Sequence, residues 1–170
     1  MRIRAARPEE YAAVGELTAR VYVEDGFVPT DFPYVVTLRD AATRAEQAEL
    51  LVALDDGGRL LGSVTFAFAG SPYAELAKGP DEAAFRMLVV DPAVRGRGVG
   101  EALVRECVRI ARKQHARVLR LSTQSEMHAA HRLYQRLGFV RTPDLDWSPV
   151  PGVDLLTYAK DLGGPTRAGR

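Results

Sequence analysis

Apolar and polar positions along the chain predict helices that alternate with strands. The apolar run 85–90 is typical of a strand buried on both faces, and Asp91-Pro92 ends it because proline has no N–H for a strand ladder. Apolar residues then recur at helical spacing through 99–110, and a second strand is predicted at 118–123. A strand–helix–strand connection of this kind makes the two strands parallel neighbours in one sheet.

Further elements are predicted on either side of this unit. Before it, the pattern predicts a short strand at Ile3, an amphipathic helix that ends near Asp25-Gly26, a second helix at about 32–44, and a hairpin of strands 50–54 and 60–69. After it come a helix that ends at Gly138, a short strand at Phe139-Val140, a proline-rich connection at 142–152 and a last strand at 153–159. Residues 163–170, half of them glycine or proline, are predicted to be a disordered tail, which leaves one domain at 1–162.

Composition and charge are those of an ordinary globular protein. The 170 residues are 46% apolar and 26% charged, and the net charge of +1 makes no case for nucleic acid or a membrane surface as a partner. The N-terminus has no apolar leader, and no apolar stretch approaches the roughly 18 residues of a membrane span. One cysteine, Cys107, excludes an intramolecular disulfide and is predicted to be a core residue, and no cluster has metal-ligand spacing. We therefore expect a cytoplasmic protein without a metal.

Residues 95–100, Arg-Gly-Arg-Gly-Val-Gly, lie between the predicted buried strand and the helix that follows it. Glycines there allow backbone N–H groups to converge on an anion, and the helix N-terminus adds free donors and a partial positive charge. The pattern therefore predicts a phosphate-binding loop. It is not a P-loop, because no Gly-Lys-Ser/Thr ends it, and Glu101 occupies the third glycine position of the dinucleotide pattern counted from Gly96.

Two motifs resemble the hallmarks of the GNAT superfamily of N-acetyltransferases. Residues 95–100, preceded by Leu88-Val89-Val90-Asp91-Pro92, fit the acyl-coenzyme A loop of that family, Gln/Arg-x-x-Gly-x-Gly/Ala. Residues 130–139 resemble its second landmark, Ala-x-x-Leu-Tyr-x-x-x-Gly-Phe, one strand and one helix further along. The resemblance implies an α/β (α+β three-layer) fold. Its central sheet would be mixed and mostly antiparallel, with about six to seven strands, a parallel and splayed central pair, and about four flanking helices.

The resemblance also implies acetyl-CoA as co-substrate, together with the residues that would hold it. Backbone N–H groups of residues 96–101 would bind the pyrophosphate, and backbone groups of residues 88–90 would pair with the pantetheine arm. The Leu88 N–H would polarise the thioester carbonyl, and Tyr134 would be the general acid that protonates the departing thiolate. Met127 stands where many members have an asparagine that hydrogen-bonds the pantetheine arm, so we expect altered contacts there. The residues expected to bind the cofactor are Leu88, Val89, Val90, Arg95, Gly96, Arg97, Gly98, Val99, Gly100, Glu101, Met127 and Tyr134.

The acceptor site is less well determined by the sequence. Acidic and aromatic residues in two loops would suit a cationic amine, and the residues expected to bind it are Glu24, Asp31, Asp144, Asp146 and Trp147. Asp31 also fits a helix cap. The group that takes the proton of the amine is left open among an ordered water and the side chains of Glu24, Glu82, Glu126 and His128.

These residues predict transfer of an acetyl group from acetyl-CoA to a primary amine of a small molecule or a protein. Two alternatives are a non-catalytic acyl-CoA-binding regulatory module and an enzyme that acts on aminoacyl-tRNA. Tyr134 favours catalysis over the first, and the near-neutral charge argues against the second. A homodimer is compatible with the resemblance.

Overall fold

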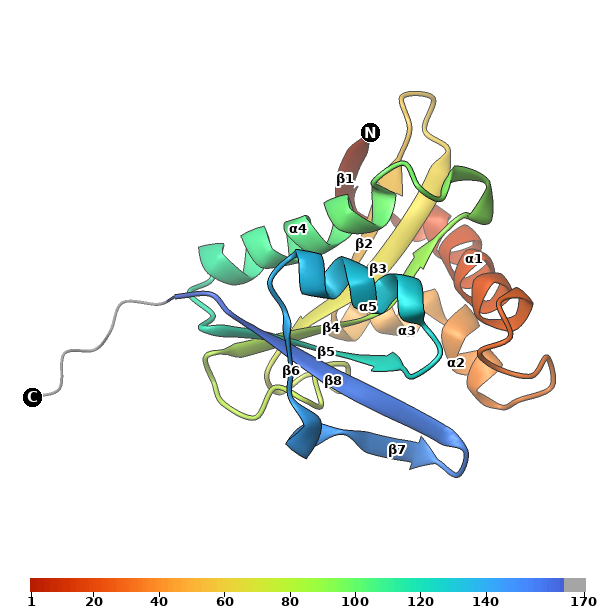
Figure 1. The fold of residues 1–170 in the computed structure, drawn as a ribbon. Helices are drawn as coiled ribbons and strands as arrows, with labels where there is room; N and C mark the ends of the chain where they lie inside the picture. The colour runs from red at the N-terminus through yellow and green to blue at the C-terminus, as the bar shows by residue number, and fades with distance from the viewer. Residues whose placement is uncertain (164–170) are drawn as a thin grey trace, which may run out of the picture.

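Residues 1–163 are built around an eight-stranded sheet (Figure 1). The computed structural model describes these residues, except for the side chains of residues 149 and 150. The strands are β1 (Arg2–Ala5), β2 (Glu49–Leu54), β3 (Leu60–Phe68), β4 (Glu82–Val90), β5 (Val118–Gln124), β6 (Val140–Arg141), β7 (Trp147–Val150) and β8 (Val153–Asp161). Their order across the sheet is β1-β2-β3-β4-β5-β8-β6, and β7 pairs with β8.

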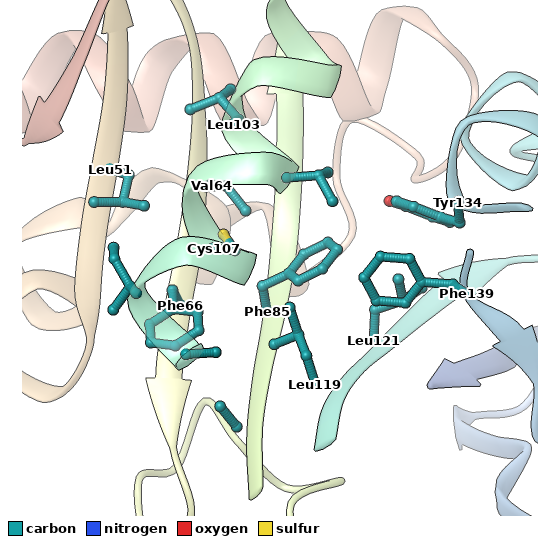
Figure 2. Packing of buried hydrophobic residues seen from close by; sticks show 14 of the residues in the cluster. Leu51, Val64, Phe66, Phe85, Leu103, Cys107, Leu119, Leu121, Tyr134 and Phe139 are labelled. Atoms are coloured by element: carbon teal, nitrogen blue, oxygen red, sulfur yellow. The ribbon is translucent and has the colours of Figure 1, made fainter. Parts of the chain in front are cut away.

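Helices cover both faces of this sheet. They are α1 (Tyr11–Glu24), α2 (Tyr34–Arg39), α3 (Ala41–Gln47), α4 (Val99–Lys113) and α5 (His128–Arg136). Both faces of the sheet are apolar and need a cover, as β2 illustrates, because successive side chains of a strand point to opposite faces. Leu51 packs in one cluster with Leu103 and Cys107 of α4 (Figure 2), whereas the adjacent Val52 packs with Val14 of α1. Cys107 is fully buried, which confirms it as a core residue, and burial raises the pKa of its thiol.

The two central strands, β4 and β5, are parallel at one end and separate at the other. They pair only from Glu82 to Phe85 on β4, although β4 continues to Val90 and β5 to Gln124. The separation follows a bulge on β4: the register with β3 shifts there, and Met87 has a φ of 54°, which a regular strand does not adopt. The edge of β4 from 86 to 90 that faces β5 therefore has no partner strand.

The mixed, mostly antiparallel sheet with a parallel central pair confirms the fold that the two motifs imply. The described part of the chain has eight strands and five helices, slightly more than expected. The proline-rich connection at 142–152 contains one of the additional strands, β7, which pairs with β8. None of the helices in residues 1–163 is long and apolar enough to span a membrane.

The prediction of a single helix at about 32–44 is wrong. The structure has two short helices there, α2 and α3, divided at Asp40. The carboxylate of Asp40 accepts a hydrogen bond of 3.1 Å from the Thr43 N–H. Asp40 is therefore the N-cap of α3, and α3 begins as a separate helix. Of the tail expected at 163–170, all but Gly163 lies outside the described residues.

Candidate functional site

Two adjoining cavities lie where β4 and β5 separate. The larger has a volume of about 850 Å³ and extends along the N-terminal ends of α4 and α5. The smaller has a volume of about 140 Å³ and is lined by the ends of β4 and β5. Tyr22, Leu88, Met127 and Ala130 line both. The two cavities therefore adjoin at these four residues, of which Leu88 lies on β4.

The glycine-rich loop and the first turn of α4 form one wall of the larger cavity. Gly96 and Gly98 line it with φ values of 78° and 80°, which side-chain-bearing residues rarely adopt. None of the N–H groups of residues 96–101 donates a hydrogen bond within residues 1–163, and the first that does is that of Ala102, to the carbonyl oxygen of Gly98 at 3.0 Å. These N–H groups remain available for an anion at a helix N-terminus.

The N-terminus of α5 faces the same cavity, which the sequence did not indicate. His128, Ala129 and Ala130 line it, and the N–H groups of Ala129 and Ala130 make no hydrogen bond with a described residue. The ring Nε2 of His131 lies 2.9 Å from the carbonyl oxygen of Gln124, a contact that holds α5 against the end of β5. The positive ends of two helix dipoles are thus directed at one cavity.

The free edge of β4 supplies a third set of donors. The Asp91 N–H donates to the carbonyl oxygen of Leu61 on the neighbouring β3, at 2.8 Å. Because backbone N–H groups of a strand alternate between its two edges, those of Leu88 and Val90 are directed the other way, toward the gap beside β5. Leu88, Val89 and Val90 all line the larger cavity, as the resemblance implies for an edge that receives an extended amide chain.

The two arginines of the loop occupy different places. Arg95 lines the larger cavity and forms an ion pair of 2.5 Å with Asp25, which follows α1. Arg97 does not line that cavity and instead lines a third pocket, with Asp55 and Arg59. Arg136 of α5 also lines the larger cavity, and its guanidinium lies 3.4 Å from the carboxylate of Glu101.

Tyr134 lines the smaller cavity from α5. Figure 2 shows its ring extending from the helix toward β4, beside Phe139, and the residue is 4% exposed. Its hydroxyl makes no hydrogen bond with any described residue. Burial raises the pKa of this hydroxyl above its ordinary value, so the phenol stays protonated at neutral pH.

Sequence comparison agrees with this geometry. A family model described as the acetyltransferase (GNAT) family matches residues 14–139. The chain belongs to the GNAT acetyltransferase family. It is 33% identical over 117 residues to the N-alpha-acetyltransferase RimI of Mycobacterium tuberculosis, with 68% of each chain covered.

Solved GNAT structures have the same fold as this chain. An acetyltransferase of the GNAT family from Staphylococcus aureus Mu50 superposes with a TM-score of 0.76 at 14% identity, over 95% of this chain and 99% of that one. The yncA protein of Salmonella typhimurium, solved with its cofactor acetyl-CoA, has a TM-score of 0.65 at 24% identity, over 96% of this chain and 94% of its own.

Within this GNAT fold, the residues expected to bind the acceptor are scattered. Trp147 lines the smaller cavity. Glu24, Asp31 and Asp144 are exposed and line neither of the adjoining cavities. Asp146 lines neither cavity, and its carboxylate accepts hydrogen bonds from Arg141 at 2.6 and 2.7 Å and from the Thr157 N–H at 2.8 Å. These contacts give Asp146 a structural role and hold its pKa down to about 2, chiefly through Arg141.

The candidates for accepting the proton of the amine are also separated. Glu82 starts β4, at the paired end of the strands, where Arg120 holds both of its carboxylate oxygens at 2.9 Å and lowers its pKa. Glu126 and His128 line the larger cavity, and Glu24 lines neither. Among the described residues, no histidine or carboxylate lines the smaller cavity. No three metal-ligating side chains are grouped within residues 1–163.

Several residues that line the smaller cavity of this GNAT protein had no signal in the sequence. Tyr22 lies on α1 and Tyr34 on α2, where the sequence pattern indicates only an amphipathic helix and not a cavity. Arg86 interrupts the apolar pattern of β4, and this interruption was the one available signal. A charged residue in a strand predicted to be buried on both faces indicates that one face meets a cavity.

Proposed function

We propose that this GNAT protein transfers an acetyl group from acetyl-CoA to a primary amine that attacks the thioester while both substrates are bound. The meeting of two cavities at Leu88 is the observation that carries the proposal. Free N–H groups at two helix ends suit the pyrophosphate, and the unpaired edge of β4 suits the amides of the pantetheine arm. The larger cavity would then hold acetyl-CoA, and the smaller one the amine.

Acetyl-CoA supplies a thioester whose carbonyl carbon is the electrophile. The Leu88 N–H, directed into the gap beside β4, donates to the carbonyl oxygen and stabilises the negative charge that develops on it. The C–N bond forms and the C–S bond breaks, and the Tyr134 hydroxyl donates its proton to the departing thiolate. The proton that the attacking nitrogen loses as it becomes an amide returns through water to the Tyr134 phenolate. Holding the two reactants side by side supplies much of the rate enhancement.

The smaller cavity offers no histidine or carboxylate among its described residues, so the acceptor reacts as the free amine. Amines with a low pKa are then favoured, because a larger fraction of them is uncharged at neutral pH. An α-amine, with a pKa near 8 when the charge of a neighbouring carboxylate is removed or neutralised, meets this condition far better than a lysine side chain near pKa 10.4.

The Tyr134→Phe variant tests the role of the phenol. We expect kcat to fall by about 10²- to 10⁴-fold, the range for loss of a general acid, while calorimetry shows acetyl-CoA binding within about twofold of the wild type. Thiol release measured over a panel of amines gives kcat. Tyr158→Phe is the matched control, because Tyr158 is a buried tyrosine whose ring centroid lies 6.0 Å from that of Tyr134 and lines neither cavity.

Equal losses in the two variants would show that the cluster of aromatic rings matters and the Tyr134 hydroxyl does not. Acetyl-CoA binding without thiol release on any amine, peptide or aminoacyl-tRNA would instead identify a non-catalytic acyl-CoA-binding module.

A further inference from the structure

The smaller cavity is lined by a cationic side chain and by no anionic one among the described residues, the opposite of what a cationic acceptor requires. Arg86 is the one charged side chain that lines it among the described residues, and the other polar groups there are hydroxyls, an amide and an indole. The polar residues of the lining are Tyr22, Tyr34, Arg86, Ser122, Thr123, Gln124, Tyr134 and Trp147. An ammonium group would lie beside a like charge in such a cavity, whereas an anionic group would meet a partner.

Arg86 is held in place and still has donors to offer. Its guanidinium donates to the Tyr34 hydroxyl at 3.0 Å and to the Glu75 carboxylate at 3.1 Å, and its side chain is 24% exposed. Glu75 does not line the cavity, so it contacts the guanidinium from outside. An arginine has five N–H donors, and those not used by Tyr34 and Glu75 make no hydrogen bond with a described residue. A fixed guanidinium with free donors is well suited to a carboxylate.

Trp147 supplies an independent observation in the same cavity. Its indole Nε1 is buried and has no hydrogen-bond partner among the described residues. Trp147 lines the cavity, and buried donors in folded proteins are almost always paired, so a small turn of the indole would let this N–H donate to a bound molecule. An oxygen atom of an acceptor molecule would satisfy it.

From these observations, and resting on the proposed function, we propose that the acceptor is a small amine that carries a carboxylate, such as an amino acid, with Arg86 as the residue that binds this carboxylate. Arg86 and Leu88 are two residues apart, so their Cα atoms lie at most about 7 Å from each other. This spacing suits an amine and a carboxylate separated by few bonds. Pairing with the guanidinium also offsets the charge of the carboxylate, which would otherwise stabilise the protonated, unreactive form of the amine.

The test measures kcat/KM for three acceptors with the same side chain: the amino acid, its amide, and a short peptide amide that begins with it. Rates are compared per concentration of free amine, because the three amines differ in pKa. The wild type should prefer the amino acid over its amide, and Arg86→Gln should reduce that preference by about 10- to 100-fold, the range for a lost charge-assisted hydrogen bond. Arg86→Lys should restore part of it.

Arg109→Gln is the control, because Arg109 forms an exposed ion pair with Glu106 on α4 and lines neither cavity. Equal use of the amino acid and its amide by the wild type, equal losses for both in Arg86→Gln, or better use of the peptide amide would each overturn the inference while leaving acetyl transfer intact. Absence of transfer to every amine, with acetyl-CoA still bound in calorimetry, would overturn the proposed function and the inference with it.

Discussion

At the scale of single residues, Arg95 and Arg97 differ in what they can contribute to a bound anion. Arg95 faces the larger cavity, but its guanidinium already contacts the carboxylate of Asp25. Arg97 is exposed and belongs to a pocket on another side of the loop. In the proposed site, the loop would therefore bind its anion chiefly through backbone N–H groups, and only one of the two arginines lies within reach to add a charge.

Replacement of each arginine by glutamine separates the two contributions. We expect Arg95→Gln to raise the Kd for coenzyme A by about 3- to 10-fold, between the effect of a screened surface contact and that of a charge-assisted hydrogen bond. Arg97→Gln should change it by less than about twofold. Isothermal titration calorimetry at low and moderate salt measures both, and a larger loss in Arg97→Gln would reverse this assignment.

At the scale of elements, the carboxylate of Asp146 links the C-terminal strands β6 and β8 by hydrogen bonds. Asp146 follows the short turn after β6 and accepts hydrogen bonds from Arg141 on β6 and from the backbone of Thr157 on β8. The next residue is Trp147, which starts β7 and lines the smaller cavity. The contacts of Asp146 therefore position the element that closes one side of the proposed acceptor site.

The contribution of Asp146 to stability depends on pH with a defined sign. Its pKa is about 2 in the folded protein, below the value near 3.9 of an unfolded chain, so its stabilisation is full above about pH 4 and is lost as the pH falls toward 2. Asp146→Asn lacks this contribution at every pH. We expect the difference in unfolding midpoint between wild type and variant to be largest above pH 4 and to vanish near pH 2.

Chemical denaturation at a series of pH values measures this difference. Asp144→Asn is the control, because the Asp144 side chain makes no hydrogen bond or ion pair with a described residue. A pH-independent difference for Asp146→Asn, or the same pH dependence for Asp144→Asn, would contradict the explanation.

The elements that the sequence predicted well are those determined by nearby residues. The unit of β4, the glycine-rich loop, α4 and β5 follows from apolar periodicity, Pro92 and the glycines, all within about forty residues of one another. The acceptor side could not be predicted in the same way. Trp147 lines the cavity because Asp146 accepts hydrogen bonds from Arg141 and from Thr157 of the neighbouring strand. Arg86 is held by Tyr34, 52 residues away, and by Glu75, and no local pattern encodes these contacts.

At the scale of the whole molecule, the separation of β4 from β5 leaves the centre of the sheet incomplete. Strand pairing stops after Phe85 and Leu121, and helix ends and loops surround the gap on both sides. A ligand that occupies the larger cavity and pairs with the free edge of β4 would complete the sheet. Binding should therefore stabilise the entire fold and not the loop alone.

Thermal unfolding with and without ligand tests this coupling. At 100 times its Kd, acetyl-CoA should stabilise the protein by about 2.7 kcal/mol, which corresponds to a rise in Tm of roughly 5–10 °C for a chain of this size. Pantetheine at the same concentration lacks the pyrophosphate and cannot use the N–H groups of residues 96–101, so its effect should be much smaller. If pantetheine raised Tm as much as acetyl-CoA, those N–H groups would contribute nothing to binding, and the glycine-rich loop would have to be assigned another role.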